Sequence, residues 1–229
     1  GVALPSGLLK YVLTRAVPTV VSILNQKGGS GKSTLATNLA RAYELEGHAA
    51  QILDGDSQRT VTEWAKLANE DMPTVTPTTA PTIKEDVDTA TSSVVFVDGA
   101  PAHDTLNVRA MKLSDLVLIP VRASGPDIWS SEDLLDSIQT RREKTGGTPR
   151  AAFVVCQQIA RTNLASEIGD VLGAYALPTL DARTNHRVAY AEALSSGTTV
   201  LDLPGAKKAE DEIRQIAEQC LELLRRTDE

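Results

Sequence analysis

The strongest chemical signal in the sequence is a glycine-rich run with two lysines, KGGSGKST. It follows a β-branched apolar run and precedes a helical pattern, which is the setting that a phosphate-binding loop requires. Glycines let successive backbone N–H groups point at phosphate oxygens, and the helix N-terminus adds its positive end. Lys32 is placed to reach terminal phosphates, and the Ser33 hydroxyl to bind Mg²⁺. The predicted phosphate site comprises Lys27, Gly28, Gly29, Ser30, Gly31, Lys32, Ser33 and Thr34.

Three carboxylates stand where two further apolar runs end. Asp98 ends the run VVFVD, and Asp54 and Asp56 belong to the sequence DGDSQ that closes the run AAQIL. The carboxyl ends of parallel strands meet at one edge of a sheet, so these side chains are expected to converge there. Beside a phosphate loop they would hold Mg²⁺ and position a water for phosphoryl transfer. Turn formation is their alternative role.

The segment KGGSGKS resembles the deviant Walker A motif of the ParA/MinD family of ATPases, and NQKGG is typical of ParA-type partition proteins. The ordinary Walker A motif has glycine at the position of Gln26. The resemblance implies that Lys27 reaches across an ATP-bound homodimer to the phosphates held by the other subunit, where an added positive charge stabilises the transition state. The alternative for Lys27 is attraction of phosphate within its own subunit.

Two further segments resemble the switch regions of that family. DGDSQ resembles DxDPQ, which implies that Asp56 orients the attacking water and Asp54 supports the metal shell, with Ser57 in place of the usual proline. VDGAP resembles the second switch and implies that Asp98 is the Walker B carboxylate, although many members carry DxPP there. Asp127 matches an acidic position near the dimer face, with helix N-capping as its alternative.

Base recognition and DNA contact are specified less sharply. Gln157 follows the run AAFVVC, and it either reads adenine or is an exposed strand-end glutamine. Residues 140–190 contain seven basic and four acidic residues, a balance of +3 that leaves −10 for the rest of a chain of net charge −7. Within this segment, Arg183 and Arg187 lie in a stretch that resembles the one where ParA proteins carry DNA-contacting arginines. Solvated surface or a local ion pair is the alternative for each.

Alternating β-branched runs and helical patterns predict an α/β fold. We expect a three-layer P-loop NTPase fold with a mostly parallel, twisted sheet and helices on both faces, because continuous apolar strands suit burial on two sides. The predicted strands are residues 17–24, 49–54, 94–98, 116–121 and 151–156. The predicted helices are residues 32–46, 60–67, 131–144 and 207–226, and a Pro/Thr-rich stretch occupies residues 73–81.

Length and composition are those of an ordinary globular chain. The 229 residues are 41% hydrophobic and 23% charged, which excludes disordered, collagen-like and coiled-coil proteins. Cys156 and Cys220 lie in apolar stretches and are predicted to be buried residues in a reducing compartment. We expect an extension at residues 1–16 and a single P-loop ATPase domain at residues 17–229. No apolar run approaches the roughly 20 residues that span a bilayer.

The resemblance implies a short ParA-type partition ATPase without an N-terminal helix-turn-helix. Such a protein binds ATP or ADP with Mg²⁺, forms a homodimer with ATP, binds DNA nonspecifically and is stimulated by a centromere-binding, ParB-like adaptor. It would be cytoplasmic and nucleoid-associated, with no membrane partner. A MinD-like membrane ATPase and another cargo-positioning ATPase remain alternatives. The former would need an amphipathic C-terminal helix with bulky apolar anchors, and the predicted C-terminal helix contains no Phe or Trp.

Overall fold

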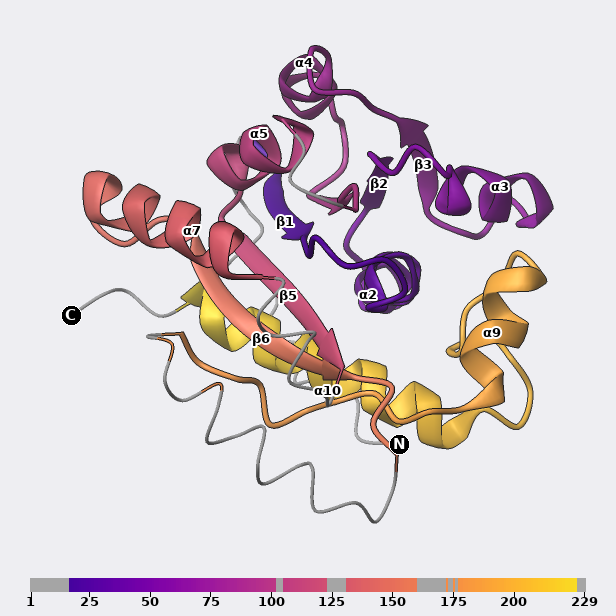
Figure 1. Ribbon diagram of the computed structural model, residues 1–229. Helices are drawn as coiled ribbons and strands as arrows, with labels where there is room; N and C mark the ends of the chain where they lie inside the picture. Colours follow the sequence, from indigo (N-terminus) through magenta and orange to yellow (C-terminus); the bar gives the residue numbers. More distant parts are fainter. Residues whose placement is uncertain are drawn as a thin grey trace.

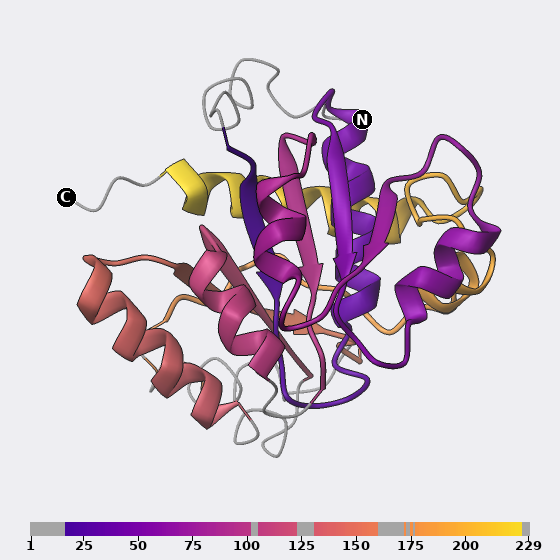
Figure 2. The ribbon, with the colours of Figure 1, turned by 90° about the horizontal axis from the view of Figure 1, so that it is seen from above.

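The computed structural model describes residues 17–101, 105–122, 131–159, 172, 175 and 177–225. Its centre is a six-stranded sheet in the order β3-β2-β4-β1-β5-β6, in which every pairing is parallel. The strand arrows point the same way in Figure 2. The strands are β1 (Thr19–Ile23), β2 (Ala50–Asp54), β3 (Thr74–Pro77), β4 (Val94–Asp98), β5 (Leu116–Arg122) and β6 (Arg150–Cys156).

Helices cover both faces of this sheet. The cluster of buried residues on one face includes side chains of α2 (Lys32–Leu45), α3 (Thr60–Leu67), α9 (Val188–Ser195) and α10 (Lys207–Arg225). The cluster on the other face includes side chains of α4 (Ile83–Asp88), α5 (Thr105–Leu113) and α7 (Glu132–Thr145). Figure 1 shows the two groups on opposite sides of the strands, with α7 and α10 flanking β5 and β6. The expected three-layer architecture is therefore confirmed.

The central strands β1 and β4 are buried along their whole length and are mainly apolar, because successive side chains point to opposite faces that are both covered. In β4, Val94 and Phe96 join the cluster of α2 and α10, whereas Val95 and Val97 join that of α5 and α7. Burying an apolar side chain of this size contributes about 1.5–3 kcal/mol. The two faces together fix the register that brings Asp54 beside Asp98.

Most predicted elements match the structure within two residues at each end. The strand predicted at residues 17–24 is shorter, since β1 covers Thr19–Ile23. The Pro/Thr-rich stretch holds an edge strand, β3, which has little apolar periodicity of its own and is defined by its pairing with β2. Three short helices, α4, α5 and α9, had no predicted counterpart. The expected N-terminal extension at residues 1–16 lies outside the described residues.

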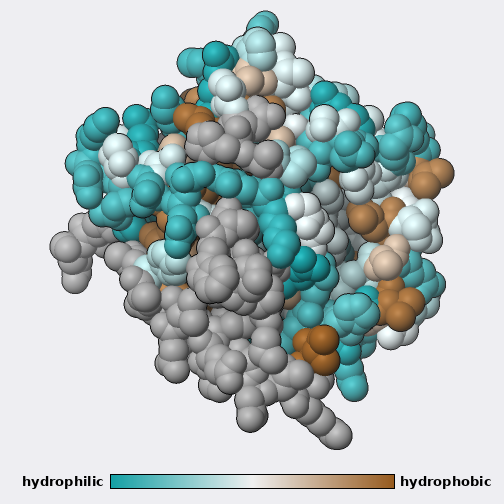
Figure 3. All heavy atoms as spheres, in the orientation of Figure 1, coloured by the Kyte–Doolittle hydropathy of each residue, from teal (hydrophilic) through white to brown (hydrophobic). Residues whose placement is uncertain are grey.

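The remaining composition-based predictions concern burial. Both cysteines are free and buried, as expected. Among the described residues no helix is both long enough and apolar enough to cross a membrane. Hydrophilic side chains dominate the described surface in Figure 3, and the brown, hydrophobic areas are small and separate.

Candidate functional site

The phosphate loop joins the end of β1 to the start of α2. Gly29 and Gly31 have φ values of 73° and 107°, a left-handed region that side chains rarely adopt, and Gly31 caps α2. The Asn25 side chain anchors the loop, because its Nδ2 donates to the Pro120 carbonyl at 2.6 Å and its Oδ1 accepts from the Lys27 N–H at 2.8 Å. The sequence thus places a fixed loop at the N-terminus of a helix.

Lys32 begins α2 and is only 5% exposed. Its Nζ donates to the Lys27 carbonyl at 3.2 Å, so the ammonium group is folded back over the loop. Burial lowers the pKa of Lys32, while the carboxylates of Asp98 and Asp56 act in the opposite direction. A partly desolvated cation at a helix N-terminus is suited to binding phosphate.

The rest of the loop differs in exposure from residue to residue. Ser30 is buried and its hydroxyl has no hydrogen-bond partner among the described residues. Gly28 is exposed, and a Cβ atom added there would meet nothing within 4 Å. Thr34 lines a pocket beside the loop. The loop therefore presents open space together with an unpaired hydroxyl.

Ser33 and Asp98 meet directly, since the Ser33 hydroxyl donates to Asp98 Oδ2 at 2.7 Å. The other oxygen, Asp98 Oδ1, is buried without a hydrogen-bond partner among the described residues. Burial raises the pKa of Asp98 to about 7, against the lowering effect of the Ser33 hydrogen bond. A hydroxyl and a carboxylate with a free oxygen are suitable donors for Mg²⁺.

A magnesium site here would be incomplete without a nucleotide. No group of three or more His, Cys, Asp or Glu within the described part of the chain is arranged to hold a metal ion. Mg²⁺ typically takes one or two protein ligands and completes its shell with phosphate oxygens and water. Ser33 and Asp98 match that number of protein ligands.

Asp54 and Asp56 have different surroundings. Both oxygens of buried Asp54 already have donors, because Oδ2 accepts from the Thr62 N–H at 2.8 Å and hydroxyl at 2.6 Å, and Oδ1 from the Asp56 N–H at 3.2 Å. Asp56 is half-buried, and its Oδ1 accepts from the Gln58 N–H at 2.9 Å. Asp54 thus shapes the segment that presents Asp56, and a metal role for Asp54 stays a prediction.

The second predicted switch is fixed by a side chain that the sequence did not single out. Asn107 Oδ1 accepts from the Ala100 N–H at 3.0 Å, and its Nδ2 donates to the Ala100 carbonyl at 2.8 Å. A Cβ atom at Gly99 would lie 2.5 Å from Leu24 and 2.8 Å from Asn107 Oδ1. Glycine is therefore required where β4 leaves the sheet.

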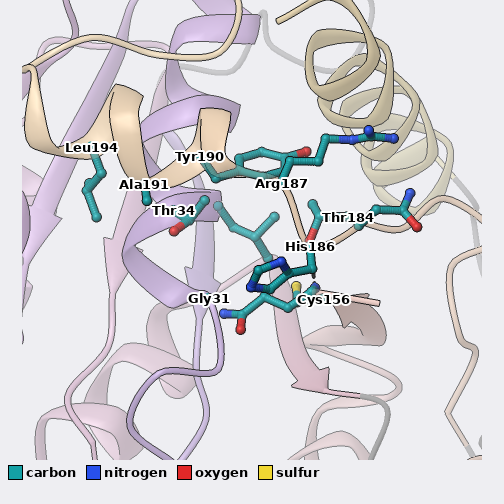
Figure 4. A pocket seen from close by; sticks show the side chains of 12 residues that line it. Gly31, Thr34, Cys156, Thr184, His186, Arg187, Tyr190, Ala191 and Leu194 are labelled. Carbon is teal, nitrogen blue, oxygen red and sulfur yellow. Dashed lines mark hydrogen bonds between the residues drawn. The ribbon is translucent and has the colours of Figure 1, made fainter. Parts of the chain in front are cut away.

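A pocket of about 260 Å³ lies beside the phosphate loop. Gly31 and Thr34 form its loop side, and the opposite wall comes from residues 184–187 and α9. Figure 4 shows the Tyr190 ring and His186 projecting into this space, with Gly31 and Cys156 at one end. Its position next to the phosphate loop and its mixed apolar and polar lining suit a nucleoside.

Gln157 connects the two sides of this pocket. Its Nε2 donates to the Gly29 carbonyl at 3.0 Å, and its N–H donates to the Thr184 hydroxyl at 3.1 Å. Its φ of 55° is unusual for a non-glycine residue. The side chain therefore supports the phosphate loop, while the prediction that it reads adenine stays a prediction.

Glu212 on α10 is a hydrogen-bond hub behind the pocket. It accepts from Arg187 Nη2 at 2.6 Å, from Asn185 Nδ2 at 2.6 Å and from the Tyr190 hydroxyl at 2.8 Å. Burial raises the pKa of Glu212, but the hydrogen bonds from these three residues outweigh burial and hold it below its usual value. In Figure 4 the Arg187 side chain extends toward α10, away from Gly31.

The two arginines predicted to contact DNA are thus engaged within the protein. Arg187 pairs with Glu212, and Arg183 donates to the Gln158 side chain and the Asp181 carbonyl at 3.2 Å each. The alternative of a local ion pair describes Arg187, and DNA contact stays a prediction for both. Asp127 lies outside the described residues.

Three residues at this edge carried no sequence signal that we used: Thr62, Asn107 and Glu212. Thr62 could have been suspected, since a hydroxyl in the first turn of a helix often meets a nearby carboxylate. Asn107 and Glu212 act on residues 7 and 25–27 positions away through tertiary packing. Spacing along the chain could not have identified them.

Sequence comparison matches the chain to one family of nucleotide-binding proteins. The sequence profile of the CobQ/CobB/MinD/ParA nucleotide binding domain matches residues 21–223. "Maintenance of carboxysome distribution protein A" of Halothiobacillus neapolitanus is 26% identical over 208 residues, which is 88% of this chain and 95% of that protein. "Protein ParA" of Rhizobium radiobacter is 34% identical over 131 residues, covering 54% of this chain and 58% of that protein.

Solved structures agree on the fold. The ATP complex of a Cyanothece McdA variant superposes with a TM-score of 0.68 at 15% identity, covering 93% of this chain and all of that chain. Cobyrinic acid a,c-diamide synthase from Mycobacterium smegmatis, with bound ADP and magnesium, has a TM-score of 0.62 at 16% identity, covering 78% and 93% of the two chains.

Proposed function

The chain belongs to the CobQ/CobB/MinD/ParA nucleotide-binding family, and we propose that it is an ATP-dependent positioning ATPase. In this proposal it binds ATP with Mg²⁺, forms a homodimer in that state, associates with DNA without sequence preference and hydrolyses ATP when an adaptor protein stimulates it. Its cargo would be DNA, as in plasmid or chromosome partition.

The observation that carries the proposal is the joint position of Lys32, Ser33 and Asp98. Lys32 folds over a loop at a helix N-terminus, and the Ser33 hydroxyl touches a carboxylate with a free oxygen. When bound, Mg²⁺ supplies charge neutralisation between the phosphates. Ser33 and Asp98 would hold it. This combination supports phosphoryl transfer better than simple anion binding.

Asp56 and Lys27 have the remaining roles in this proposal. Asp56 is half-buried, and its carboxylate raises the pKa of both Lys32 and Asp98, so the three charges belong to one site; in this proposal Asp56 positions a water near a terminal phosphate. The Lys27 carbonyl accepts from Lys32 Nζ, and in this proposal the Lys27 side chain reaches the phosphates held by a second subunit. Such a shared lysine would make hydrolysis depend on dimer formation.

The DNA-association part is tested by DNA retention with ATP and with ADP at two salt concentrations. Binding should appear only with ATP, show no sequence preference and weaken steeply with salt, because phosphate attraction supplies nonspecific affinity. Lys32→Ala, with ATP present, is the control. Equal retention with ADP would contradict the proposal. Failure to bind DNA together with sedimentation on anionic liposomes would favour the MinD-like alternative.

A second candidate keeps the mechanism and changes the cargo. The Halothiobacillus neapolitanus relative is named for carboxysome distribution and is matched over 88% of this chain, whereas the partition protein ParA is matched over 54%. This chain would then distribute a large protein body. Deletion of the gene discriminates the two: faster plasmid loss supports DNA partition, whereas normal plasmid inheritance with clustering of a protein body supports the second cargo.

A further inference from the structure

The segment that joins β2 to α3 carries Asp56, and both flanks of this segment are fixed. On the β2 side, the Gly55 N–H donates to the Asp98 carbonyl at 2.9 Å. On the α3 side, Trp64 is 1% exposed, and its Nε1 donates to the Thr198 carbonyl at 2.8 Å. Asp56 therefore lies on a short span between two anchored elements.

The middle of this segment takes its shape from two hydrogen bonds to Asp56. Packing contributes little there, because Ser57 and Gln58 are exposed. The Gln58 N–H donates to Asp56 Oδ1, and the Arg59 N–H donates to the Asp56 carbonyl, both at 2.9 Å. The direction of the Asp56 carboxylate thus depends on the turn that Arg59 closes.

Arg59 closes that turn in an unusual backbone conformation. Its φ of 54° and ψ of 33° are left-handed. A Cβ atom makes this conformation unfavourable, whereas glycine adopts it readily. An arginine at this position is therefore favoured only if its side chain contributes free energy in return.

The guanidinium group of Arg59 binds the ends of two strands. Its Nη1 donates to the carbonyl of Asp54, the last residue of β2, and at 3.4 Å to the carbonyl of Thr78, which follows β3. The Thr78 N–H donates to the same Asp54 carbonyl at 2.9 Å. Hydrogen bonds from a cation are stronger than neutral ones, and the planar guanidinium holds its donors in fixed directions. The side chain therefore clamps the turn to the edge of the sheet that carries the phosphate site.

We propose that Arg59 is a positioning residue for Asp56. The clamp keeps the Asp56 carboxylate in one site with Lys32 and Asp98, where its charge acts to raise the pKa of both. This inference rests on the proposed function, in which Asp56 positions the attacking water. Because Arg59 acts through Asp56 and lies outside the phosphate loop, its loss should slow hydrolysis and leave ATP binding nearly unchanged.

Steady-state phosphate release by the full chain, without DNA or adaptor, tests the inference. Arg59→Gly removes the guanidinium group and keeps a residue that tolerates the left-handed backbone. We expect kcat to fall about tenfold, with KM for ATP–Mg²⁺ within about twofold of the unmodified protein. The matched control is Arg150→Ala, which removes a guanidinium hydrogen bond to the Leu224 carbonyl. Arg150 begins β6, at the opposite edge of the sheet, so kcat should stay within about twofold.

Coupling to Asp56 separates positioning from general stabilisation. Asp56→Ala should slow turnover by about 100-fold, and adding Arg59→Gly should cost no further activity, because the carboxylate that Arg59 positions is already absent. Additive losses in the double variant would overturn the inference, as would weakened ATP binding in Arg59→Gly. Full activity of Arg59→Gly beside a slow Asp56→Ala refutes the clamp alone. Normal turnover in Asp56→Ala refutes the role of Asp56 in the proposed function, and the clamp with it.

Two further substitutions at Arg59 separate the guanidinium group from the backbone. Arg59→Ala removes the clamp and also disfavours the left-handed turn, so it should be at least as slow as Arg59→Gly. If Arg59→Ala is slow while Arg59→Gly is fully active, the backbone shape alone matters and the clamp is refuted. Arg59→Lys keeps the cation without the planar fork and should slow kcat about threefold. It decides the question if Arg59→Gly fails to fold, since an unchanged kcat in Arg59→Lys would contradict the clamp.

Discussion

The two walls of the pocket beside Gly31 are built in opposite ways. The phosphate-loop wall belongs to the consecutive residues 25–35, of which Gly31, Thr34 and Leu35 line the pocket. Its hydrogen bonds mostly join neighbours, such as Asn25 with Lys27 and Lys27 with Lys32. The opposite wall comes from β6, residues 184–187 and α9, and it is held by Glu212 of α10. The first wall is local in sequence, and the second exists only in the folded chain.

The polar groups of the first wall are available to a ligand, whereas those of the second wall stabilise the folded protein. The phosphate loop presents a cation and, with Asp98 beside it, a hydroxyl and a carboxylate oxygen that have no hydrogen-bond partner among the described residues, and these groups can serve a ligand. The Glu212 wall satisfies its charges internally, through Arg187, Asn185 and Tyr190. Substitutions in the two walls should therefore affect different measurements.

The largest effect is expected for Lys32→Ala, which removes a nearly buried cation from the loop wall. ATP affinity should fall at least 100-fold, about 3 kcal/mol, as typically found when one partner of a desolvated charge pair is truncated. Isothermal titration calorimetry with ATP and Mg²⁺ measures the loss, and Lys66→Ala is the control. An unchanged affinity would place the nucleotide elsewhere.

Lys27→Ala should retain more nucleotide binding than Lys32→Ala while slowing hydrolysis. Loss of one transition-state contact costs on the order of 3 kcal/mol, about 100-fold in rate. Steady-state phosphate release and sedimentation velocity with ATP measure hydrolysis and dimerisation. Near-normal values of both would refute the deviant Walker A interpretation.

Asp56→Ala should also leave ATP binding intact and slow turnover by about 100-fold, because water positioning acts on the transition state more than on the ground state. The ATP-bound dimer should then accumulate. Asp54→Asn is the informative companion, since Asp54 bonds to Thr62 and should report on stability. Loss of nucleotide binding in Asp56→Ala would make Asp56 a structural residue.

Glu212→Gln tests the second wall. The pKa of Glu212 is held below its usual value of 4.5, so its stabilising effect is fully present above pH 4.5 and is lost as pH falls through the lowered pKa. The variant should be about 2 kcal/mol less stable at pH 7, because hydrogen bonds to a charged group are lost, and the difference should shrink below pH 4. Urea unfolding at several pH values measures it. A difference that does not change with pH would contradict the assigned role.

The smallest effect is expected at the junction of the two walls. Gln157→Ala removes the hydrogen bond to the Gly29 carbonyl and should weaken ATP binding about fivefold, roughly 1 kcal/mol. If Gln157 reads adenine, the loss should be larger for ATP than for GTP. If Gln157 only supports the loop, both nucleotides should lose equally.

Much of the fold and of the phosphate site could be predicted from residue order. The loop glycines, the lysine at the start of α2 and the carboxylates that end β2 and β4 lie where the sequence predicted them, because helix starts, left-handed turns and strand ends depend largely on near neighbours. Their roles toward a nucleotide stay predictions. The edge strand β3 was not predicted, because its pairing with β2 defines it and its own residue pattern does not.

The sequence by itself determined the kind of site, because a helix N-terminus, positive φ angles and a cation all lie within eight residues, and the distant Pro120 and Gln157 only anchor the loop. Only the tertiary structure decided which charges are free. α10 places Glu212 beside Arg187, and the two form an ion pair that their separation along the chain does not reveal, while DNA contact by Arg187 stays a prediction. The physical reason is that the pairing of a charge depends on what packs next to it, and packing joins residues that the chain keeps far apart.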